Sequence, residues 1–139
     1  MQKEIIIVII IIIAIIVGHV VSQNYTKQSV ALITDRLNEI KELAEQMDEN
    51  DKQNIDNTQN KEELSQKLSD IRATWKNINR TMAFYIEHDE LEKVNTSLIL
   101  TEGYLTMEDY SQGVPELENC EYILRHIQDK QSMQIINLF

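Results

Sequence analysis

Residues that break helices or cross-link a chain are scarce in this sequence. Its 139 residues include three glycines, one proline and one cysteine, and neither glycine nor proline occurs between Val20 and Glu102. Long stretches without these residues favour helices over strands and turns. The lone Cys120 excludes an intramolecular disulfide and a zinc site of the CxxC type. Because its spacing places it on an apolar helical stripe, we expect Cys120 to be a small buried hydrophobic residue, with an intermolecular disulfide as the alternative.

Basic residues are also few. Thirteen Lys and Arg face 23 Asp and Glu, which gives a formal net charge of −10. This balance argues against nucleic acid and against anionic lipid headgroups as partners. A basic partner surface or cations would fit the charge, but a solvated acidic surface is the simpler interpretation.

Catalytic motifs are missing as well. The sequence contains no nucleophile elbow, no phosphate-binding loop, no HExxH pair and no EF-hand spacing. We therefore predict a non-enzymatic protein without a cofactor. An unrecognised hydrolase is the alternative.

One feature dominates what is present. Residues 5–21 read IIIVIIIIIAIIVGHVV, an aliphatic run with one Gly and one His. Seventeen helical residues span roughly 26 Å, close to the ~30 Å hydrocarbon core of a bilayer. A helix that is apolar on every side suits a membrane rather than the surface of a soluble domain. We predict a transmembrane anchor at residues 1–22 and a water-facing domain at residues 23–139.

The anchor is longer than the apolar region of a typical cleavable signal, so we favour an uncleaved segment. Cleavage after Ser22 stays open as an alternative. Charges flanking the run give almost no orientation, and the short N-terminal tail decides the topology. The prediction is a single-pass protein of the cell membrane whose C-terminal domain lies outside the cytoplasm.

Apolar residues recur at spacings of three and four through the rest of the chain. This coiled-coil-like pattern predicts amphipathic helices. The expected helices are about 24–48, 61–87, 89–109 and 113–131, followed by an apolar tail at 132–139. Four such helices with short connections predict an all-α fold in which a transmembrane helix precedes an antiparallel bundle. The first helix can run on from the anchor as one rod.

The stripe of the second helix changes phase near His88, which indicates a helix boundary there. Asp89 and Glu92 have the spacing of a capping box for the third helix, and one long kinked helix is the rival interpretation. Gly113 and Pro115 signal a turn before the fourth helix, with the proline in that helix's first turn.

The densest polar cluster surrounds the same boundary. His88 and Glu92 lie four residues apart, and His126 could add a second imidazole, so a metal site can be imagined. Bundle metal sites use Glu-x-x-His pairs on two helices, and none occurs here. We therefore predict capping and ion pairing by this cluster and no metal, with metal binding and catalysis as weaker alternatives.

Two apolar features complete the candidates. Trp75 lies on the stripe of the second helix, and we expect it to anchor the core. An exposed apolar tail would be a liability, so we expect the C-terminal residues to pack on the bundle or to dock in a partner groove. The candidate docking residues are Ile135, Ile136, Leu138 and Phe139.

The order of motifs from Trp75 onward is similar to a known family. After Trp75 come FYIEHDELEKVNTSL (residues 84–98), LRHI (residues 124–127) and a closing MQIINLF. This order resembles the domain of unknown function 4363 family, short and mostly clostridial proteins of Firmicutes. The resemblance covers the anchor and especially residues 75–139. It implies membrane attachment and a helical fold, and it brings no activity.

The chain departs from that family in its longer polar insert at residues 48–60 and in Gly113 and Pro115. The last two leave the start of the fourth helix open between residues 110 and 115. The resemblance also points to a membrane complex, with a multipass membrane protein as one candidate partner.

Two functional hypotheses follow. The first is an interaction or accessory subunit of a membrane complex, with the lipid bilayer and a membrane protein as partners. The second is an extracytoplasmic sensor of a small ligand or cation, using the region of His88 and Glu92. The sequence leaves the oligomeric state open.

Overall fold

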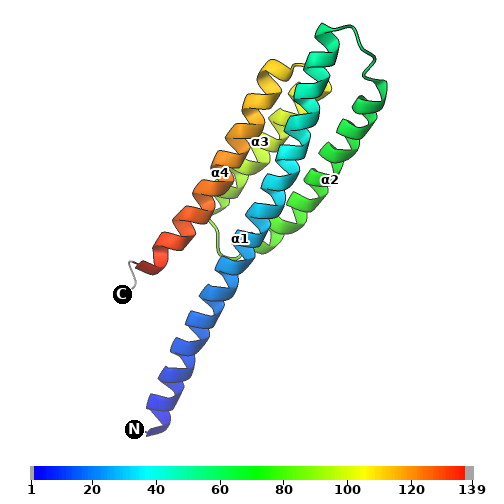
Figure 1. The fold of residues 1–139 in the computed structure, drawn as a ribbon. Coiled ribbons are helices and arrows are strands. Elements are labelled where there is room, and N and C mark those ends of the chain that lie inside the picture. The colour runs from blue at the N-terminus through cyan, green and yellow to red at the C-terminus, as the bar shows by residue number, and fades with distance from the viewer. Residues whose placement is uncertain (1, 137–139) are drawn as a thin grey trace.

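The computed structural model describes the backbone of residues 2–136 and the side chains of residues 3–133. Within these bounds the chain is all-helical and contains no strand. The helices are α1 (Gln2–Lys52), α2 (Thr58–Met82), α3 (His88–Thr106) and α4 (Tyr110–Ile136). They run up and down in alternation and form an antiparallel bundle, as Figure 1 shows. The predicted fold class is therefore confirmed.

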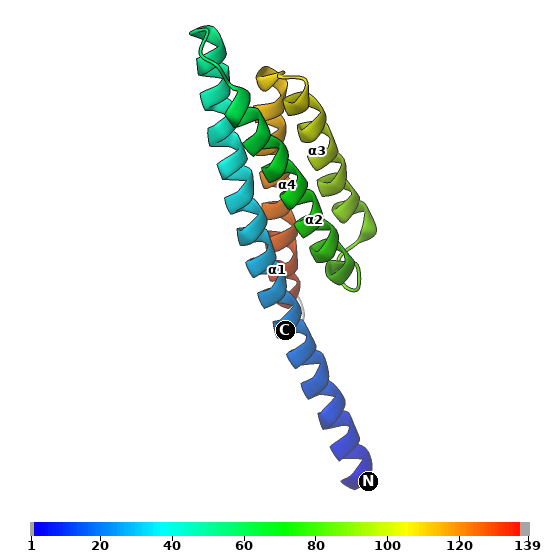
Figure 2. The ribbon, with the colours of Figure 1, turned by 90° about the vertical axis from the view of Figure 1, so that its right-hand side faces the viewer.

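Helix α1 is one unbroken helix of 51 residues that serves two purposes. Its first part projects alone from the bundle, and its second part packs inside the bundle (Figures 1 and 2). The projecting part is long and apolar enough to cross a membrane, and none of its most apolar stretch is buried in the protein. A signal sequence near an N-terminus would meet the same criterion.

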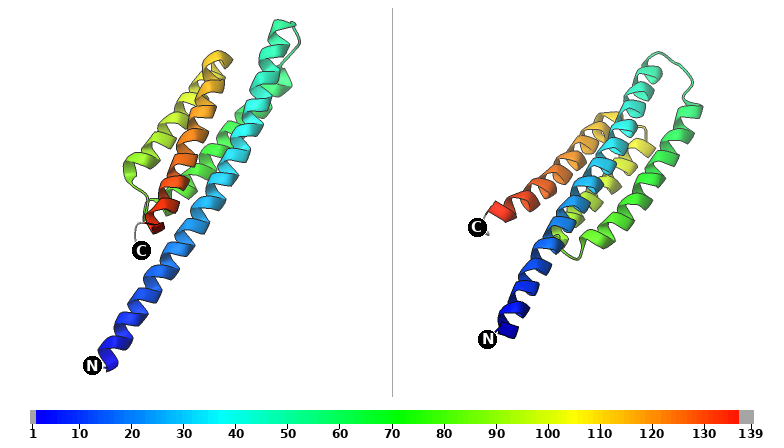
Figure 3. Two further views of the ribbon diagram at one scale, coloured as in Figure 1. Left: turned by 60° about the vertical axis from the view of Figure 1, so that its left-hand side comes forward. Right: turned by 60° about the horizontal axis from the view of Figure 1, so that its bottom comes forward.

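The helices of the bundle pack in a ring in which α1 and α4, the first and the last in the chain, are also neighbours. Helix α1 packs against both α2 and α4, and α3 packs chiefly against α4. In Figure 2, α1 and α3 lie on opposite sides, with α2 and α4 between them. We call the end from which the projecting part of α1 leaves the base, and the opposite end the distal end. The connection between α2 and α3 lies at the base, whereas the other two connections lie at the distal end (Figure 3).

The predicted apolar stripes form the core. Burying such residues drives folding because each large aliphatic side chain removed from water contributes roughly 1.5–3 kcal/mol. Trp75 is 2% exposed and Cys120 is 0% exposed, so both lie in this core as expected. The buried residues of the four stripes are Val30, Ile33, Leu37, Ile40, Ala44 and Met47; Leu64, Leu68, Ile71, Trp75, Ile78 and Met82; Leu91, Val94, Leu98 and Leu105; and Leu117, Cys120, Leu124 and Ile127.

The first connection is shorter than the polar composition of residues 48–60 suggests. Helix α1 continues to Lys52, whose ammonium pairs with Asp48 one turn earlier at 2.5 Å. Asn57 then closes the turn from a buried position. Its side-chain amide donates to the Met47 carbonyl at 2.9 Å and to Asp51 at 2.7 Å. Most of this polar segment therefore belongs to helices α1 and α2, and only residues 53–57 form the compact turn between them.

The fourth helix begins at the early limit of the range 110–115 that the sequence left open, three residues before the expected start at about residue 113. Helix α4 begins at Tyr110, and Pro115 lies inside the helix rather than in its first turn. The reason is a cap at Asp109, whose carboxylate accepts hydrogen bonds from the Gln112 backbone N–H at 3.3 Å and the Ser111 hydroxyl at 2.7 Å. An aspartate at this position satisfies N–H groups that the first turn leaves without partners.

The expected capping box at Asp89 is wrong. Helix α3 begins at His88, its N-cap residue is Glu87, and no side chain caps it by a hydrogen bond. Asp89 lies in the first turn, where a negative charge is still favourable because of the helix dipole. The boundary near His88 is confirmed, since α2 and α3 are separate antiparallel helices and not one kinked helix.

The tail does not form a separate segment after residue 131. Helix α4 continues through Ile136, so Ile135 and Ile136 belong to it. Their side chains, and all of Leu138 and Phe139, lie outside the described residues.

Candidate functional site at the base of the bundle

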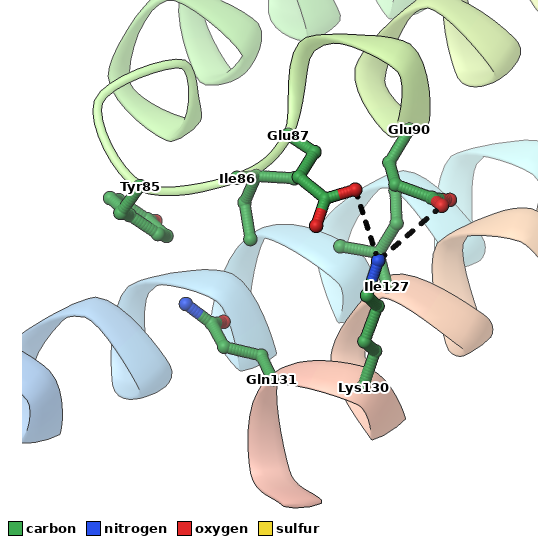
Figure 4. Close-up of a pocket in the computed structure, with 7 residues that line it drawn as sticks. All are labelled: Tyr85, Ile86, Glu87, Glu90, Ile127, Lys130 and Gln131. Carbon is green, nitrogen blue, oxygen red and sulfur yellow. Dashed lines mark hydrogen bonds and ion pairs between the residues drawn. The ribbon is translucent and has the colours of Figure 1, made fainter. Parts of the chain in front are cut away.

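The base holds a small cavity where three segments meet. The turn between α2 and α3, the first turn of α3 and the end of α4 enclose about 30 Å³ (Figure 4). The lining residues are Tyr85, Ile86, Glu87, Glu90, Ile127, Lys130 and Gln131. This volume suits one or two water molecules, which need about 10–15 Å³ of such space each, and it is too small for an organic ligand.

Charged side chains close the cavity on one side. The Lys130 ammonium reaches from α4 to Glu87 at 3.2 Å and to Glu90 at 3.7 Å, as Figure 4 shows. Glu90 is buried and also pairs with Lys93 at 3.2 Å. The hydrogen bond to Glu87 raises the pKa of Lys130. Burial raises the pKa of Glu90, but the hydrogen bond and charge of Lys93, with the charge of Lys130, outweigh it and lower that pKa overall.

Two oxygen atoms at this site lack partners within the described structure. They are Oε2 of Glu90 and Oε1 of Gln131, and both are buried. Buried polar atoms of this kind are usually satisfied by ordered water. The chemistry of the cavity is therefore that of a hydrated ion pair, with acceptors facing a space that already contains the Lys130 ammonium.

The same residues tie the base to α1. The Gln23 side-chain amide donates to the Gln131 carbonyl at 3.2 Å. The hydroxyls of Thr26 and Tyr85 lie 3.3 Å apart in a hydrogen bond. Partial burial raises the pKa of Tyr85, and the bond to Thr26 offsets part of that rise. The cavity thus lies beside the part of α1 that follows its apolar stretch.

The residues predicted for a metal site do not line this cavity. His88 and Glu92 are exposed near the start of α3, and His126 is exposed on α4. Nowhere in the described part of the chain do three or more His, Cys, Asp or Glu side chains form a group that could hold a metal ion.

Sequence reasoning missed Lys130 and Gln131. A signal for Gln131 was present, because it continues the spacing of the fourth apolar stripe four residues after Ile127 yet is polar. A buried polar residue on an apolar stripe marks a place where hydrogen-bonding partners must be found. The partners themselves come from α1 and from the turn before α3, which no local pattern indicates.

A second surface differs from the rest of the bundle. Between Thr96 and Met107 the outward part of α3 carries one charged side chain, Glu102, which pairs with Arg72 of α2, although the chain as a whole is 26% charged. A Cβ added to Gly103 would meet nothing within 4 Å, so this part of the helix is open. We call this surface the α3 face, and it consists of Thr96, Ile99, Leu100, Gly103 and Met107.

The family described as "Domain of unknown function (DUF4363)" matches residues 20–138. The chain belongs to this family. The match contains the whole bundle, including the cavity at the base and the α3 face, and it leaves most of the apolar stretch outside. The DUF4363 domain is therefore the bundle itself. Neither the curated proteins nor the solved structures include a match to this chain.

Proposed function

We propose that this DUF4363 protein is a non-enzymatic, single-pass membrane protein that presents its bundle outside the cytoplasm as an interaction or accessory subunit of a membrane complex. The α3 face is the observation that carries this proposal. Ile99 and Leu100 are 47% and 42% exposed there, and Met107 is 71% exposed. Single apolar residues on a surface are ordinary, but a row of them at helical spacing is the usual footprint of a docked helix.

The row also has the shape that helix docking requires. Gly103 lies between Leu100 and Met107 on the α3 face, and a glycine there allows the backbone of a partner helix to approach closely. Helix α3 lies across the bundle from α1, so the α3 face is directed away from the anchor's own helix. A helix of a multipass membrane protein that extends beyond the bilayer is the partner of this proposal.

Crosslinking in the native cells tests the proposal. A photoreactive residue at Leu100 should capture a membrane protein, whereas the same residue at Gln66, which is exposed on α2, should not. Gly103→Leu supplies the decisive variant. The fold has room for the leucine, and its helix propensity is better by about 1 kcal/mol, yet its side chain would block the partner. Capture should disappear while the melting temperature stays equal or rises.

Equal capture from both positions, or capture unaffected by Gly103→Leu, would contradict docking on the α3 face. A chain that always purifies alone, with nothing crosslinked from either position, would contradict the role as a subunit.

A second candidate function is sensing of a cation or a small ligand, and the unpaired oxygens of Glu90 and Gln131 favour it. The size of the cavity restricts the ligand to an ion or a molecule comparable to water. Thermal melting of the full chain in detergent, with divalent cations added one at a time, tests this function. A stabilising shift that Glu90→Gln removes and His88→Ala leaves intact supports sensing in the cavity. No shift in the wild type rejects it.

A further inference from the structure

The turn between α2 and α3 exposes an aromatic side chain at the base. Phe84 is 88% exposed, the largest value for any bulky apolar residue that the structure describes. The turn itself is well defined, because the backbone N–H groups of Tyr85 and Ile86 donate to the Met82 carbonyl at 2.9 and 2.8 Å. The exposure of Phe84 is thus a property of an ordered turn.

The height of this turn above the apolar stretch of α1 can be derived from two contacts. Thr26 meets Tyr85, which follows Phe84, and Gln23 meets Gln131. At about 1.5 Å per helical residue, Thr26 lies only about 8 Å beyond Val21, the last residue of the apolar stretch. The headgroup layer on each side of a bilayer is itself about 5–8 Å thick. If the stretch spans a membrane, the base of the bundle lies at the outer edge of this layer.

The bundle cannot be held farther from the bilayer. Helix α1 passes from the apolar stretch into the bundle without interruption, and its one glycine, Gly18, lies inside that stretch. Long helices bend sharply at proline, at Gly/Ser pairs or at π-bulges. Residues 19–52 of α1 contain no proline and no glycine, and the Ser22 hydroxyl that donates to the Gly18 carbonyl at 2.8 Å leaves α1 one unbroken helix. A stiff rod therefore fixes the distance between the base and the lipid.

The base offers the lipid an exposed aromatic side chain. Phe84 is exposed in the turn, Tyr85 follows it, and aromatic rings favour the boundary between headgroups and acyl chains. Lys27 on α1 and Arg80 near the end of α2 are exposed at the same end. Lys130 is engaged by Glu87 and Glu90, and Lys93 by Glu90. The formal net charge of −10 disfavours attraction of the chain to anionic lipid, so the favoured contact with lipid is apolar.

We propose that the turn of residues 83–87 inserts Phe84 into the interfacial layer of the same membrane that α1 spans, so that the bundle stands on the bilayer at two points. This inference rests on the membrane anchoring of the proposed function. It is independent of any partner on the α3 face. The second point would fix the rotation of the bundle about α1, which one helix through a bilayer does not do.

Fluorescence of the full chain in phosphatidylcholine liposomes tests the inference. In a Trp75→Phe background, Phe84→Trp places the one tryptophan in the turn, and Met107→Trp is the matched control in the exposed distal connection. Lipids brominated on their acyl chains should quench the emission of the Phe84→Trp chain at least twofold. The emission should also shift to the blue, and salt should leave both effects unchanged. The Met107→Trp chain should show neither effect.

A second probe covers the case in which Trp75→Phe disturbs the fold. Phe84→Cys in the otherwise natural chain can carry an environment-sensitive dye, because Cys120 is buried and does not compete for the label. The dye should be quenched by spin-labelled lipid, and the same dye attached through Met107→Cys should not.

Flotation of the liposomes separates the two possible failures. Chains that float with the liposomes while both positions stay equally unquenched overturn the insertion of Phe84 and leave the anchoring intact. Chains that do not float overturn the anchoring, and the inference fails with it.

Discussion

The two ends of the bundle are closed by different chemistry. At the distal end, buried Asn57 receives and donates four hydrogen bonds that join it to the end of α1 and the start of α2. Asp109 caps α4 at the same end. At the base, the turn of residues 83–87 has backbone hydrogen bonds but no side-chain cap on α3, and it exposes Phe84.

Backbone strain follows the same division. Asn54 and Glu108 have φ angles of 55° and 60°, and within the described chain no other non-glycine residue has a positive φ. Both lie in distal turns, where Ile55 and Asp109 donate backbone hydrogen bonds to carbonyls five residues earlier. A left-handed residue costs roughly 1–2 kcal/mol unless it is glycine. The distal turns bear this cost because their hydrogen bonds fix the conformation.

This difference indicates which surroundings, bulk water or the headgroup layer, suit each end of the bundle. An end that is surrounded by bulk water must satisfy its own polar groups and gains nothing from exposed rings. An end that touches the headgroup layer can present aromatic surface without aggregation. The distribution of caps and aromatic residues along the bundle thus agrees with the proposal that the bundle stands upright on a membrane anchor.

Both ends depend on one core, so the largest expected effect lies there. Trp75→Ala should lower the free energy of unfolding by about 3–5 kcal/mol, because it removes a buried indole and leaves a cavity. Urea denaturation of the full chain in detergent measures this loss. Trp75→Phe is the control and should cost less, since the indole N–H has no partner in the described structure. A loss below about 1 kcal/mol from Trp75→Ala would show that the indole is exposed and is not part of the core.

The sequence was sufficient for the core and insufficient for the turns. Buried and exposed positions alternate with the period of a helix, so Leu64 and Leu124 could be assigned to the core from spacing alone. The start of α4 was left open between residues 110 and 115, because Gly113 and Pro115 indicated a turn, whereas the spacing of Asp109 and Gln112 is that of a cap. The role of Asn57 was not predictable, since its partners come together only when the chain reverses.

The sequence predicted the region of the candidate site, but it did not predict which residues form the site. The polar residues around His88 mark the first turn of α3, and Glu90 of that turn does line the cavity. Its counterpart Lys130 lies 40 residues later in the sequence, and only the antiparallel packing of α3 and α4 brings the two together. Sequence spacing describes one helix at a time, whereas an ion pair between helices depends on how they are arranged.

The second prediction concerns the distal end. Asn57→Ala should cost about 1–3 kcal/mol, because it leaves the Met47 carbonyl and Asp51 without their hydrogen-bond donor. Urea denaturation measures this loss, and Gln53→Ala, in the same turn and exposed, is the matched control. Equal losses from both substitutions would mean that the buried network does not distinguish the distal end from an ordinary turn.

The third prediction concerns the base and its pH dependence. The pKa of Glu90 is lower in the folded chain than in the unfolded chain, where it is about 4.3. Its ion pairs therefore stabilise the fold above that value, and this contribution is lost as the pH falls through the folded pKa. Between pH 7 and pH 3, the melting temperature of Glu90→Gln should fall less than that of the wild type.

Glu42→Gln, on the exposed side of α1, is the matched control and should lose as much as the wild type on acidification. If Glu90→Gln and Glu42→Gln behaved alike, the ion pairs at the base would contribute no more than a surface charge.

The last prediction uses Cys120 as a reporter between the two ends, since it lies on α4 about midway between Tyr110 and Gln131. Burial raises the pKa of its thiol to about 12, so almost no reactive thiolate exists at pH 8. Iodoacetamide should label the native chain only when the bundle opens. If the ends open together, Asn57→Ala should speed labelling about tenfold for each 1.4 kcal/mol it costs. If the distal end opens alone, labelling should keep the wild-type rate although the urea midpoint falls. Because α4 joins both ends through a single core, we expect the first result.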